Sequence, residues 1–340
     1  MVTGPKRTAD PRSPWGEEGE SGVESGGMAS TEATRPGLSV VIPVYNSEEI
    51  LPDLLERLAA VLPKLAGAHE VILVNDGSRD HSWGRIQEMA ARYPFVRGFE
   101  LMRNFGQHNA LLAGIRAARF DLVVTMDDDL QHPPEEIGKL LASLTPDKDV
   151  VYGVPEVLPH SPGRNLASRL TKLVLQKAMG AEIASRVDAF RVFRTQVREA
   201  FANFVGAYIS LDVLLTWGTT RFGMVVVDHH PRRIGVSNYT FRKLTTHALN
   251  MMTGFSTLPL QLASLLGFGT TAFGIVVMVY VFARVFLENA APAGFPLLVG
   301  IISIFSGSQL VALGIIGEYL ARVHTRSLDR PPYVVRGRTS

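Results

Sequence analysis

The sequence predicts an α/β domain built on a doubly wound, mostly parallel sheet, followed by two C-terminal helices that cross a membrane. Between residues 38 and 153, short β-branched runs alternate with amphipathic stretches, as in sheets covered by helices on both faces. Residues 244–283 and 289–317 then contain no Asp, Glu, Lys or Arg, and about 20 apolar residues suffice to span a bilayer. Charged residues make up only 19% of the 340 residues, below the roughly 25% of an ordinary soluble domain.

Residues 1–37 form a part of different composition, rich in Gly, Ser, Glu and Pro. They contain no apolar stretch of the signal-peptide type, so we expect a disordered N-terminal tail. Met28 stays open as an alternative start.

The α/β domain is expected to occupy residues 38–240. The predicted strands are Leu38–Val44, Glu70–Val74, Val96–Met102, Leu122–Met126 and Asp149–Tyr152, and the predicted helices are Glu48–Leu65, His81–Tyr93, Gln107–Ala118 and Pro134–Leu144. Ligands of such sheets bind beyond the carboxyl ends of the strands. The residues that follow each strand are therefore where chemistry is expected.

Residues 241–321 are expected to hold a juxtamembrane helix and two transmembrane helices, at about 261–287 and 295–320. The alternative, two buried helices of a soluble core, fits poorly with charge-free runs as long as residues 244–283 and 289–317. The connector 288–294 has no Lys or Arg, whereas both flanks are basic. The positive-inside rule then places the α/β domain, both termini and the basic tail 322–340 in the cytoplasm, with the chain a multi-pass protein of the plasma (inner) membrane.

A further amphipathic stretch, Asn165–Met179, carries Arg169, Lys172 and Lys177 between apolar residues at helical spacing. It predicts a helix that lies on the membrane surface. An ordinary helix of the domain is the alternative.

Composition excludes several classes of site. The chain has no cysteine, so disulfides, thiolate zinc sites and cysteine nucleophiles are excluded. Its 34 basic and 32 acidic residues give a net charge of +2, which argues against nucleic-acid binding by bulk charge. His229 and His230, which precede Pro231, are expected to be structural.

Three consecutive carboxylates, Asp127, Asp128 and Asp129, follow the fourth predicted strand. Their mutual repulsion in a partly desolvated cleft is costly without a counter-charge. Carboxylate oxygens suit Mg²⁺ or Mn²⁺, and these cations commonly bridge substrate phosphates. A solvated turn that caps the next helix is the alternative.

Taken together, the motifs resemble those of the family 2 glycosyltransferases of GT-A fold, from about Leu38 to Arg336. The resemblance is closest to their polyprenyl-phosphate glycosyltransferase branch. The matching residues are Val41–Asn46, Asn75–Ser78, Arg103–His108, Asp127–Pro134 and Gly317–Tyr319.

The resemblance implies a nucleotide-sugar donor, a divalent cation (Mg²⁺ or Mn²⁺), a polyprenyl-phosphate acceptor, contact with membrane lipids and a possible homo-tetramer. The implied donor-binding residues are Pro43, Tyr45, Asn46, Glu48, Asp76, Asp127 and Asp128. The implied metal ligands are Asp127, Asp129 and Gln131, and the implied catalytic residues are Asp127, Asp129 and Arg191. The implied acceptor-phosphate residues are Arg164, Arg191, Arg233, Ser237 and Tyr239.

The chain departs from the family pattern at four positions. Asp128 replaces an Ala, Asn75 an Asp, and Asn238 a Lys, while Pro155 stands where a basic residue is common. The last two differences remove cations, so the acceptor phosphate depends more on the remaining arginines or this branch handles a different donor or acceptor.

These expectations define a membrane enzyme that moves a sugar, most simply from a UDP-sugar, to a polyprenyl phosphate (undecaprenyl or decaprenyl phosphate) with inversion. A phosphate monoester is already anionic at neutral pH, because its second pKa is about 6, so no general base is needed. One alternative is a processive polysaccharide synthase, but its Gln-x-x-Arg-Trp motif is absent. A catalytically silent scaffold of a glycan assembly complex is the other, and the intact Asp76, Asp127 and Asp129 argue against it.

Overall fold

The computed structural model describes residues 36–156, 187–206, 210–230, 258–288, 294–328 and 330–339. Residues 1–35 of the expected tail 1–37, the expected surface helix 165–179 and the acceptor residues Arg164, Arg233, Ser237 and Tyr239 lie outside the described residues.

One sheet of eight strands organises the α/β domain, in the order β7-β5-β6-β4-β1-β2-β3-β8. The strands are β1 (Leu38–Val44), β2 (His69–Asn75), β3 (Val96–Leu101), β4 (Leu122–Thr125), β5 (Val150–Pro155), β6 (Arg191–Arg194), β7 (Phe222–Val227) and β8 (Val335–Arg338). β4, β1, β2 and β3 run parallel to one another, whereas β6 and β8 pair antiparallel with their neighbours. The predicted parallel half is confirmed, and the antiparallel strands are an addition to it.

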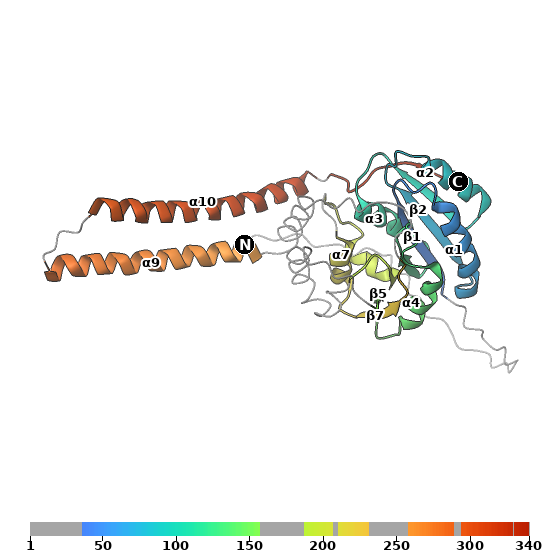
Figure 1. Ribbon diagram of the computed structural model, residues 1–340, viewed down its shortest axis with the longest axis horizontal. Helices are drawn as coiled ribbons and strands as arrows, with labels where there is room; N and C mark the ends of the chain where they lie inside the picture. Colours follow the sequence, from blue (N-terminus) through green and yellow to red (C-terminus); the bar gives the residue numbers. More distant parts are fainter. Residues whose placement is uncertain are drawn as a thin grey trace, which may run out of the picture. The chain divides into compact units, whose positions relative to one another are not determined.

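Helices cover both faces of this sheet (Figure 1). They are α1 (Leu51–Leu65), α2 (Ser82–Arg92), α3 (Gln107–Ala117), α4 (Ile137–Ser143) and α7 (Leu211–Gly218), with short 3₁₀ turns η1 (Pro134–Glu136) and η3 (Thr195–Phe201). A hydrophobic core forms on each face of the sheet, and β1 contributes to both. Its Val40 and Ile42 join the core under α1, α2 and α4, whereas Val41 joins the core under α3 and α7, because successive strand residues face opposite sides.

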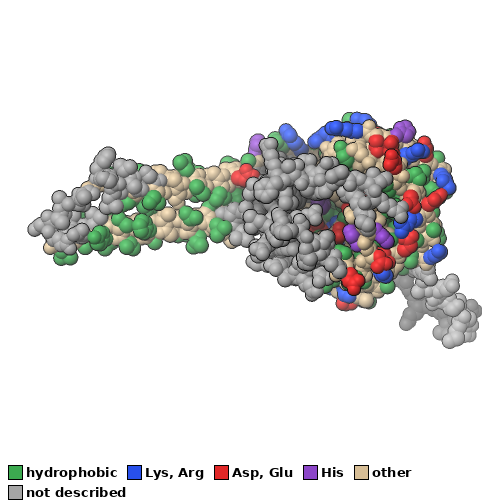
Figure 2. Space-filling model, in the orientation of Figure 1, with side chains coloured by type: hydrophobic (Ala, Val, Ile, Leu, Met, Phe, Trp, Pro, Cys, Tyr) green, Lys and Arg blue, Asp and Glu red, His purple; other side chains and the backbone are tan. Residues whose placement is uncertain are grey.

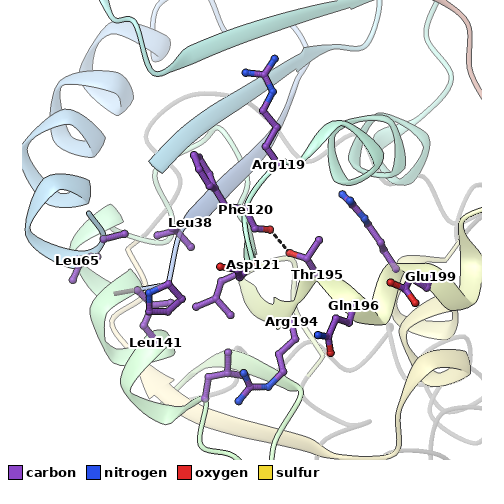
Figure 3. A pocket seen from close by; sticks show the side chains of 15 residues that line it. Leu38, Leu65, Arg119, Phe120, Asp121, Leu141, Arg194, Thr195, Gln196 and Glu199 are labelled. Atoms are coloured by element: carbon purple, nitrogen blue, oxygen red, sulfur yellow. Dashed lines mark hydrogen bonds between the residues drawn. The ribbon is translucent and has the colours of Figure 1, made fainter. Parts of the chain in front are cut away.

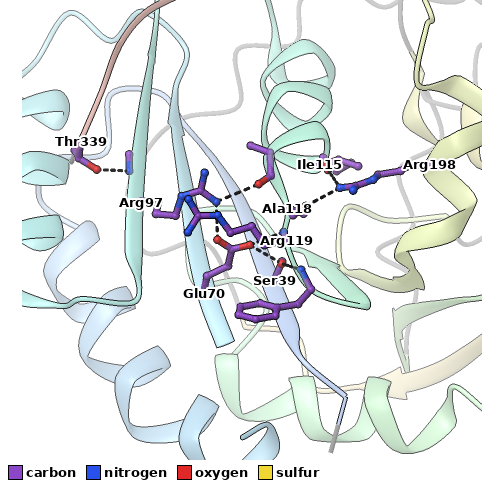
Figure 4. A network of polar contacts seen from close by, with 11 residues as sticks. Ser39, Glu70, Arg97, Ile115, Ala118, Arg119, Arg198 and Thr339 are labelled. Atoms are coloured by element: carbon purple, nitrogen blue, oxygen red, sulfur yellow. Dashed lines mark hydrogen bonds and ion pairs between the residues drawn. The ribbon is translucent and has the colours of Figure 1, made fainter. Parts of the chain in front are cut away.

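A buried polar network holds the amino ends of the strands (Figure 4). The Glu70 carboxylate accepts hydrogen bonds from the Ser39 hydroxyl (2.8 Å), the Arg119 backbone N–H (2.7 Å) and the Arg97 guanidinium (2.6 Å). Glu70 is 4% exposed, and a buried carboxylate is tolerated when it is paired in this way. The network joins β1, β2 and β3 at the end of the sheet opposite to Asp127.

A cavity of about 700 Å³ opens at the same end of the sheet (Figure 3). Its lining includes Leu38 and Leu122, with which β1 and β4 begin, together with Arg119, Asp121 and Arg194. Donor binding is expected at the carboxyl ends of these strands, so this cavity is not assigned to the donor.

Two long helices, α9 (Leu258–Glu288) and α10 (Gly294–Ser327), follow the α/β domain in the sequence and pack side by side (Figure 1). Each contains a window apolar enough to cross a membrane, Leu260–Tyr280 and Ile304–Ala321. Almost none of the residues in these windows is buried, and Figure 2 shows hydrophobic side chains along both helices, with most of the coloured charged side chains on the α/β domain. Long exposed apolar surface of this kind belongs in lipid rather than in a soluble core.

The sequence interpretation placed residues 322–340 in a basic tail. The structure adds a strand within that segment. Residues 335–338 form β8, which pairs antiparallel with the edge strand β3. The Gly98 N–H also donates to the Thr339 hydroxyl (2.8 Å), and Tyr333 packs against the core under α3. An edge strand offers a row of unpaired backbone groups, and this segment satisfies those of β3.

Candidate active site

The candidate site lies where the adjacent strands β4, β1 and β2 end. Because these strands are parallel, the segments that follow them meet at one edge of the sheet. We call residues 45–48 the donor loop and residues 127–131 the acidic turn. Three sequence-predicted groups, the donor loop, Asp76 and the acidic turn, are thereby brought together.

The acidic turn crowds its carboxylates into a poorly solvated place. Burial, with the neighbouring charges of Asp129 and Asp128, raises the pKa of Asp127 to about 7. Burial likewise raises the pKa of Asp128 to about 6, although hydrogen bonds from Ser47 and Tyr45 oppose the shift. Asp129 is 7% exposed, and Leu130 adopts a left-handed conformation (φ 57°) that closes the turn. Clustered carboxylates with raised pKa values favour a cation in their midst.

The side-chain oxygens of the acidic turn suit a hard divalent cation. Asp127, Asp129 and Gln131 offer only oxygen ligands from side chains, the kind that Mg²⁺ and Mn²⁺ prefer. Among the described residues, no group of three His, Cys, Asp or Glu side chains is arranged to hold an ion.

Two hydrogen bonds from backbone N–H groups fasten the donor loop to the loop after β2. The Asn46 side-chain oxygen accepts from the Arg79 N–H (2.8 Å), and Glu48 accepts from the His81 N–H (2.7 Å). Asn46 is left-handed (φ 55°), a conformation that Asn tolerates. These two predicted donor ligands therefore also shape the site. Tyr45, with 43% of its surface exposed, offers a ring for a nucleobase.

Asp76 anchors the loop after β3. Its carboxylate is 3% exposed and accepts hydrogen bonds from the backbone N–H groups of Phe105 (2.7 Å) and Gly106 (2.8 Å). Burial raises the pKa of Asp76, and the two backbone hydrogen bonds oppose that shift. Gly106 is left-handed (φ 95°) and α3 begins directly after it. Asp76 thus sets the start of α3, whose Gln107 side chain donates to Asp127 (2.6 Å).

Arg191 has surroundings that differ from those expected of a phosphate ligand. Its side chain is 1% exposed on β6, and its guanidinium donates to Asp212 of α7 and to the Thr125 hydroxyl (3.1 Å). Tyr152 donates to the same Asp212 (3.1 Å). Arg191 is a buried partner of Asp212. It pairs with Thr125, the last residue of β4, so it lies at the same edge of the sheet as the acidic turn, and its predicted role toward the acceptor phosphate stays a prediction.

Two histidines, His132 and His229, lie close together beside the acidic turn, and the sequence interpretation did not predict this arrangement. His132 stacks on Phe190 with ring centroids 4.9 Å apart. Its Nε2 lies 3.3 Å from His229 Nδ1 and 3.6 Å from an Asp188 oxygen. His229 Nε2 is in turn 3.4 Å from Gln131 Nε2. His132 stands in the Asp127–Pro134 motif, and His229 belongs to the pair of histidines before Pro231. Nothing in the sequence indicated that the end of β7 brings His229 to the acidic turn.

Known proteins share this arrangement of motifs. A family model described as "Glycosyl transferase family 2" matches residues 39–201. The undecaprenyl-phosphate 4-deoxy-4-formamido-L-arabinose transferase of Pseudomonas fluorescens is 34% identical over 88% of each chain. The protein of that name from Shewanella sediminis is 35% identical over 88% of this chain and 91% of its own.

Among solved structures, a glucosyl-3-phosphoglycerate synthase of Mycobacterium tuberculosis in complex with Mn²⁺, UDP and glucosyl-3-phosphoglycerate aligns with 64% of this chain and 78% of its own. The identity is 18% and the TM-score 0.46.

The two relatives each align over 304 residues, which is 88% of this chain. The predicted GT-A fold, with a mostly parallel sheet and two C-terminal candidate membrane helices, is confirmed, and so is the prediction of a glycosyltransferase. The chain belongs to glycosyl transferase family 2, in its polyprenyl-phosphate glycosyltransferase branch.

Proposed function

We propose that the enzyme transfers a sugar from a nucleoside diphosphate sugar, most simply a UDP-sugar, to a polyprenyl phosphate, with inversion and with a bound divalent cation. The observation that carries this proposal is the acidic turn beside the donor loop, in one chain with two candidate membrane helices. The named relatives act on undecaprenyl phosphate, which supports a lipid acceptor of that class.

The chemistry needs little from the protein beyond position and charge. An oxygen of the acceptor phosphate attacks the anomeric carbon of the donor sugar and forms the new C–O bond. The bond between the anomeric carbon and the donor's diphosphate oxygen breaks, and the nucleoside diphosphate leaves with the electron pair of the broken bond. A cation at Asp127 and Asp129 would screen the charge that develops on the diphosphate. The protein itself holds the donor loop, through Asn46 and Glu48, and the start of α3, through Asp76. Fixed geometry of this kind is a major source of catalysis.

The acceptor phosphate is proposed to bind Arg164 and Arg233, with Ser237 and Tyr239 beside them. Support comes from the path of the chain: β7 ends close to the acidic turn, where the His230 N–H donates to the Gln131 carbonyl (2.8 Å). The segment that carries Arg233 follows directly in the sequence. Arg191 contributes indirectly, as a buried support of the sheet under the site.

The membrane arrangement is proposed to be a hairpin whose two domain-proximal ends lie in the cytoplasm. The pairing of β8 with β3 supports it, because the chain returns to the same sheet after α10. The sheet, the start of α9 and the end of α10 then lie on one side of the membrane. The absence of Lys and Arg from the connector 288–294 makes that side the cytoplasm by the positive-inside rule.

A donor screen tests the proposed function. Full-length chain in detergent is incubated with undecaprenyl or decaprenyl phosphate, Mg²⁺ or Mn²⁺, and a panel of UDP- and GDP-sugars that includes UDP-4-deoxy-4-formamido-L-arabinose. We expect a lipid product heavier than the acceptor by one sugar residue, and none with Asp129→Asn. A wild-type preparation that binds metal and yields no lipid product from any donor would overturn the proposal.

A further inference from the structure

The third carboxylate of the acidic turn contacts the donor loop. Asp128 Oδ2 accepts a hydrogen bond from the Ser47 hydroxyl at 2.5 Å and a second from the Tyr45 backbone N–H at 3.3 Å. Asp128 follows β4 and Ser47 follows β1, and these strands are direct neighbours in the sheet. The two bonds therefore join two segments that are 81 residues apart in the chain.

The two hydrogen bonds from the donor loop saturate one oxygen of the Asp128 carboxylate, Oδ2. A carboxylate oxygen offers about two lone pairs, and Oδ2 uses both for the donor loop. Asp127 has a different partner, since its Oδ1 accepts from the Gln107 side chain on α3. The charge of Asp128 has a use as well, since a hydrogen bond to an ionised acceptor is roughly twice as strong as a neutral one.

The donor loop is held on its other side by the loop after β2. The Ser47 N–H donates to the Ser82 hydroxyl (2.9 Å), and the Asn46 N–H donates to the Ser78 hydroxyl (3.0 Å). Asp128 supplies the matching tie on the side of the metal-type turn. With both ties in place, the loop that would hold the nucleotide and the turn that would hold the cation keep a fixed distance.

We propose that Asp128 is a positioning residue, which fixes the donor loop to the acidic turn through Ser47 by its Oδ2 atom. This adds a role to the one that the sequence interpretation gave Asp128 among the donor ligands. It also gives a reason for an acidic residue at a position where the family pattern has Ala. The inference deepens the proposed function and rests on a nucleotide bound at this site.

A double-mutant cycle tests the proposal by binding rather than by turnover. The affinity for UDP, with GDP in parallel, is measured by calorimetry at saturating Mn²⁺ on the full-length chain in detergent. The variants are Ser47→Ala, Asp128→Ala, their combination, the conservative Ser47→Thr and Asp128→Asn, and Ser143→Ala in α4 as a matched control outside the site. The affinity for Mn²⁺ alone is measured on Ser47→Ala, which leaves every carboxylate in place, and thermal unfolding confirms that each variant is folded.

If Asp128 acts through Ser47, each alanine variant weakens nucleotide binding about tenfold, and the double variant is no weaker than either one. Ser47→Thr and Asp128→Asn, which keep a donor and an acceptor, restore most of the affinity. Mn²⁺ binding to Ser47→Ala and nucleotide binding to Ser143→Ala stay at the wild-type value.

Additive losses, about a hundredfold in the double variant, would show that Ser47 and Asp128 bind the ligand independently and would overturn the proposal. Wild-type nucleotide affinity in Ser47→Ala would overturn it too. No lipid acceptor is present, so failure of sugar transfer in the donor screen leaves this result intact. Normal transfer with an additive cycle would reject only the positioning role.

Discussion

The Met102 backbone N–H donates to the Val334 carbonyl at 2.9 Å. This bond joins the end of edge strand β3 to the segment that follows the second candidate membrane helix, 232 positions later in the chain. Beside it, Asp76 anchors Phe105 and Gly106. The end of the chain is thus built into the edge of the sheet next to a loop of the candidate active site.

Deletion of residues 331–340 should destabilise the α/β domain. It removes β8 and the packing of Tyr333 and Val335 on the core, and it leaves the edge of β3 open. We expect the unfolding temperature in detergent to fall by about 5 °C or more, since 1 kcal/mol corresponds to roughly 2–4 °C for a domain of this size. Deletion of Ser340 alone is the control, and an unchanged midpoint in the longer deletion would refute the structural role.

Replacement of Arg191 by Ala should act on folding more than on lipid recognition. Removal of one partner of a buried ion pair costs about 3–5 kcal/mol, and Asp212 would lose its cationic partner and keep only the hydrogen bond from Tyr152. The double variant Arg191→Leu with Asp212→Leu should be more stable than either single Leu variant. The measurement is chemical unfolding. If Arg191→Ala has wild-type stability and a raised KM for the lipid phosphate, the residue is an acceptor ligand after all.

Asp76→Ala should release the loop after β3. The Phe105 and Gly106 amides would then lose their shared acceptor, and their hydrogen exchange should become faster. Nucleotide binding should weaken about tenfold, in line with the loss of a charged acceptor. Asp76→Asn keeps one acceptor oxygen, so its amide exchange rates and its nucleotide affinity should lie between those of the wild type and those of Asp76→Ala. Unchanged amide protection in Asp76→Ala would contradict the anchoring role.

Cation affinity should depend on pH. Burial and the neighbouring carboxylates raise the pKa of Asp127 to about 7, and a metal ion must displace that proton. Mn²⁺ affinity should therefore be highest above pH 7 and fall below it, by up to roughly tenfold per pH unit for one displaced proton. Mn²⁺ titrations between pH 6 and 8 test this. The Asp127→Asn variant should bind weakly with a flatter profile, whereas a flat wild-type profile would contradict the expectation.

The sequence predicted the parallel half of the fold because its signals are local. The β-branched runs of β1, β2 and β4 and the polar residues after them follow from strand periodicity, and parallel strands bring their carboxyl ends together. This was enough to assemble the donor loop, Asp76 and the acidic turn.

The antiparallel additions depend on contacts between distant segments. β6 and β8 are four residues long, and β8 is the polar run Val-Arg-Gly-Arg, whose place at the edge of β3 has no local signal. The same holds for side chains: the partner of Arg191 is Asp212 on α7, and His229 reaches Gln131 from the end of β7. The family resemblance implied that Arg191 binds the acceptor phosphate, and only the three-dimensional structure shows that its side chain is buried against Asp212.

Identification of both reaction products tests the central claim most directly. With full-length chain, a nucleotide-sugar that supports turnover, Mn²⁺ and undecaprenyl phosphate, mass spectrometry should find a lipid with one phosphate and one sugar, together with an equal amount of nucleoside diphosphate. Both should disappear in Asp129→Asn. A lipid with two phosphates and a nucleoside monophosphate, or nucleoside diphosphate without any sugar-bearing lipid, would contradict the account.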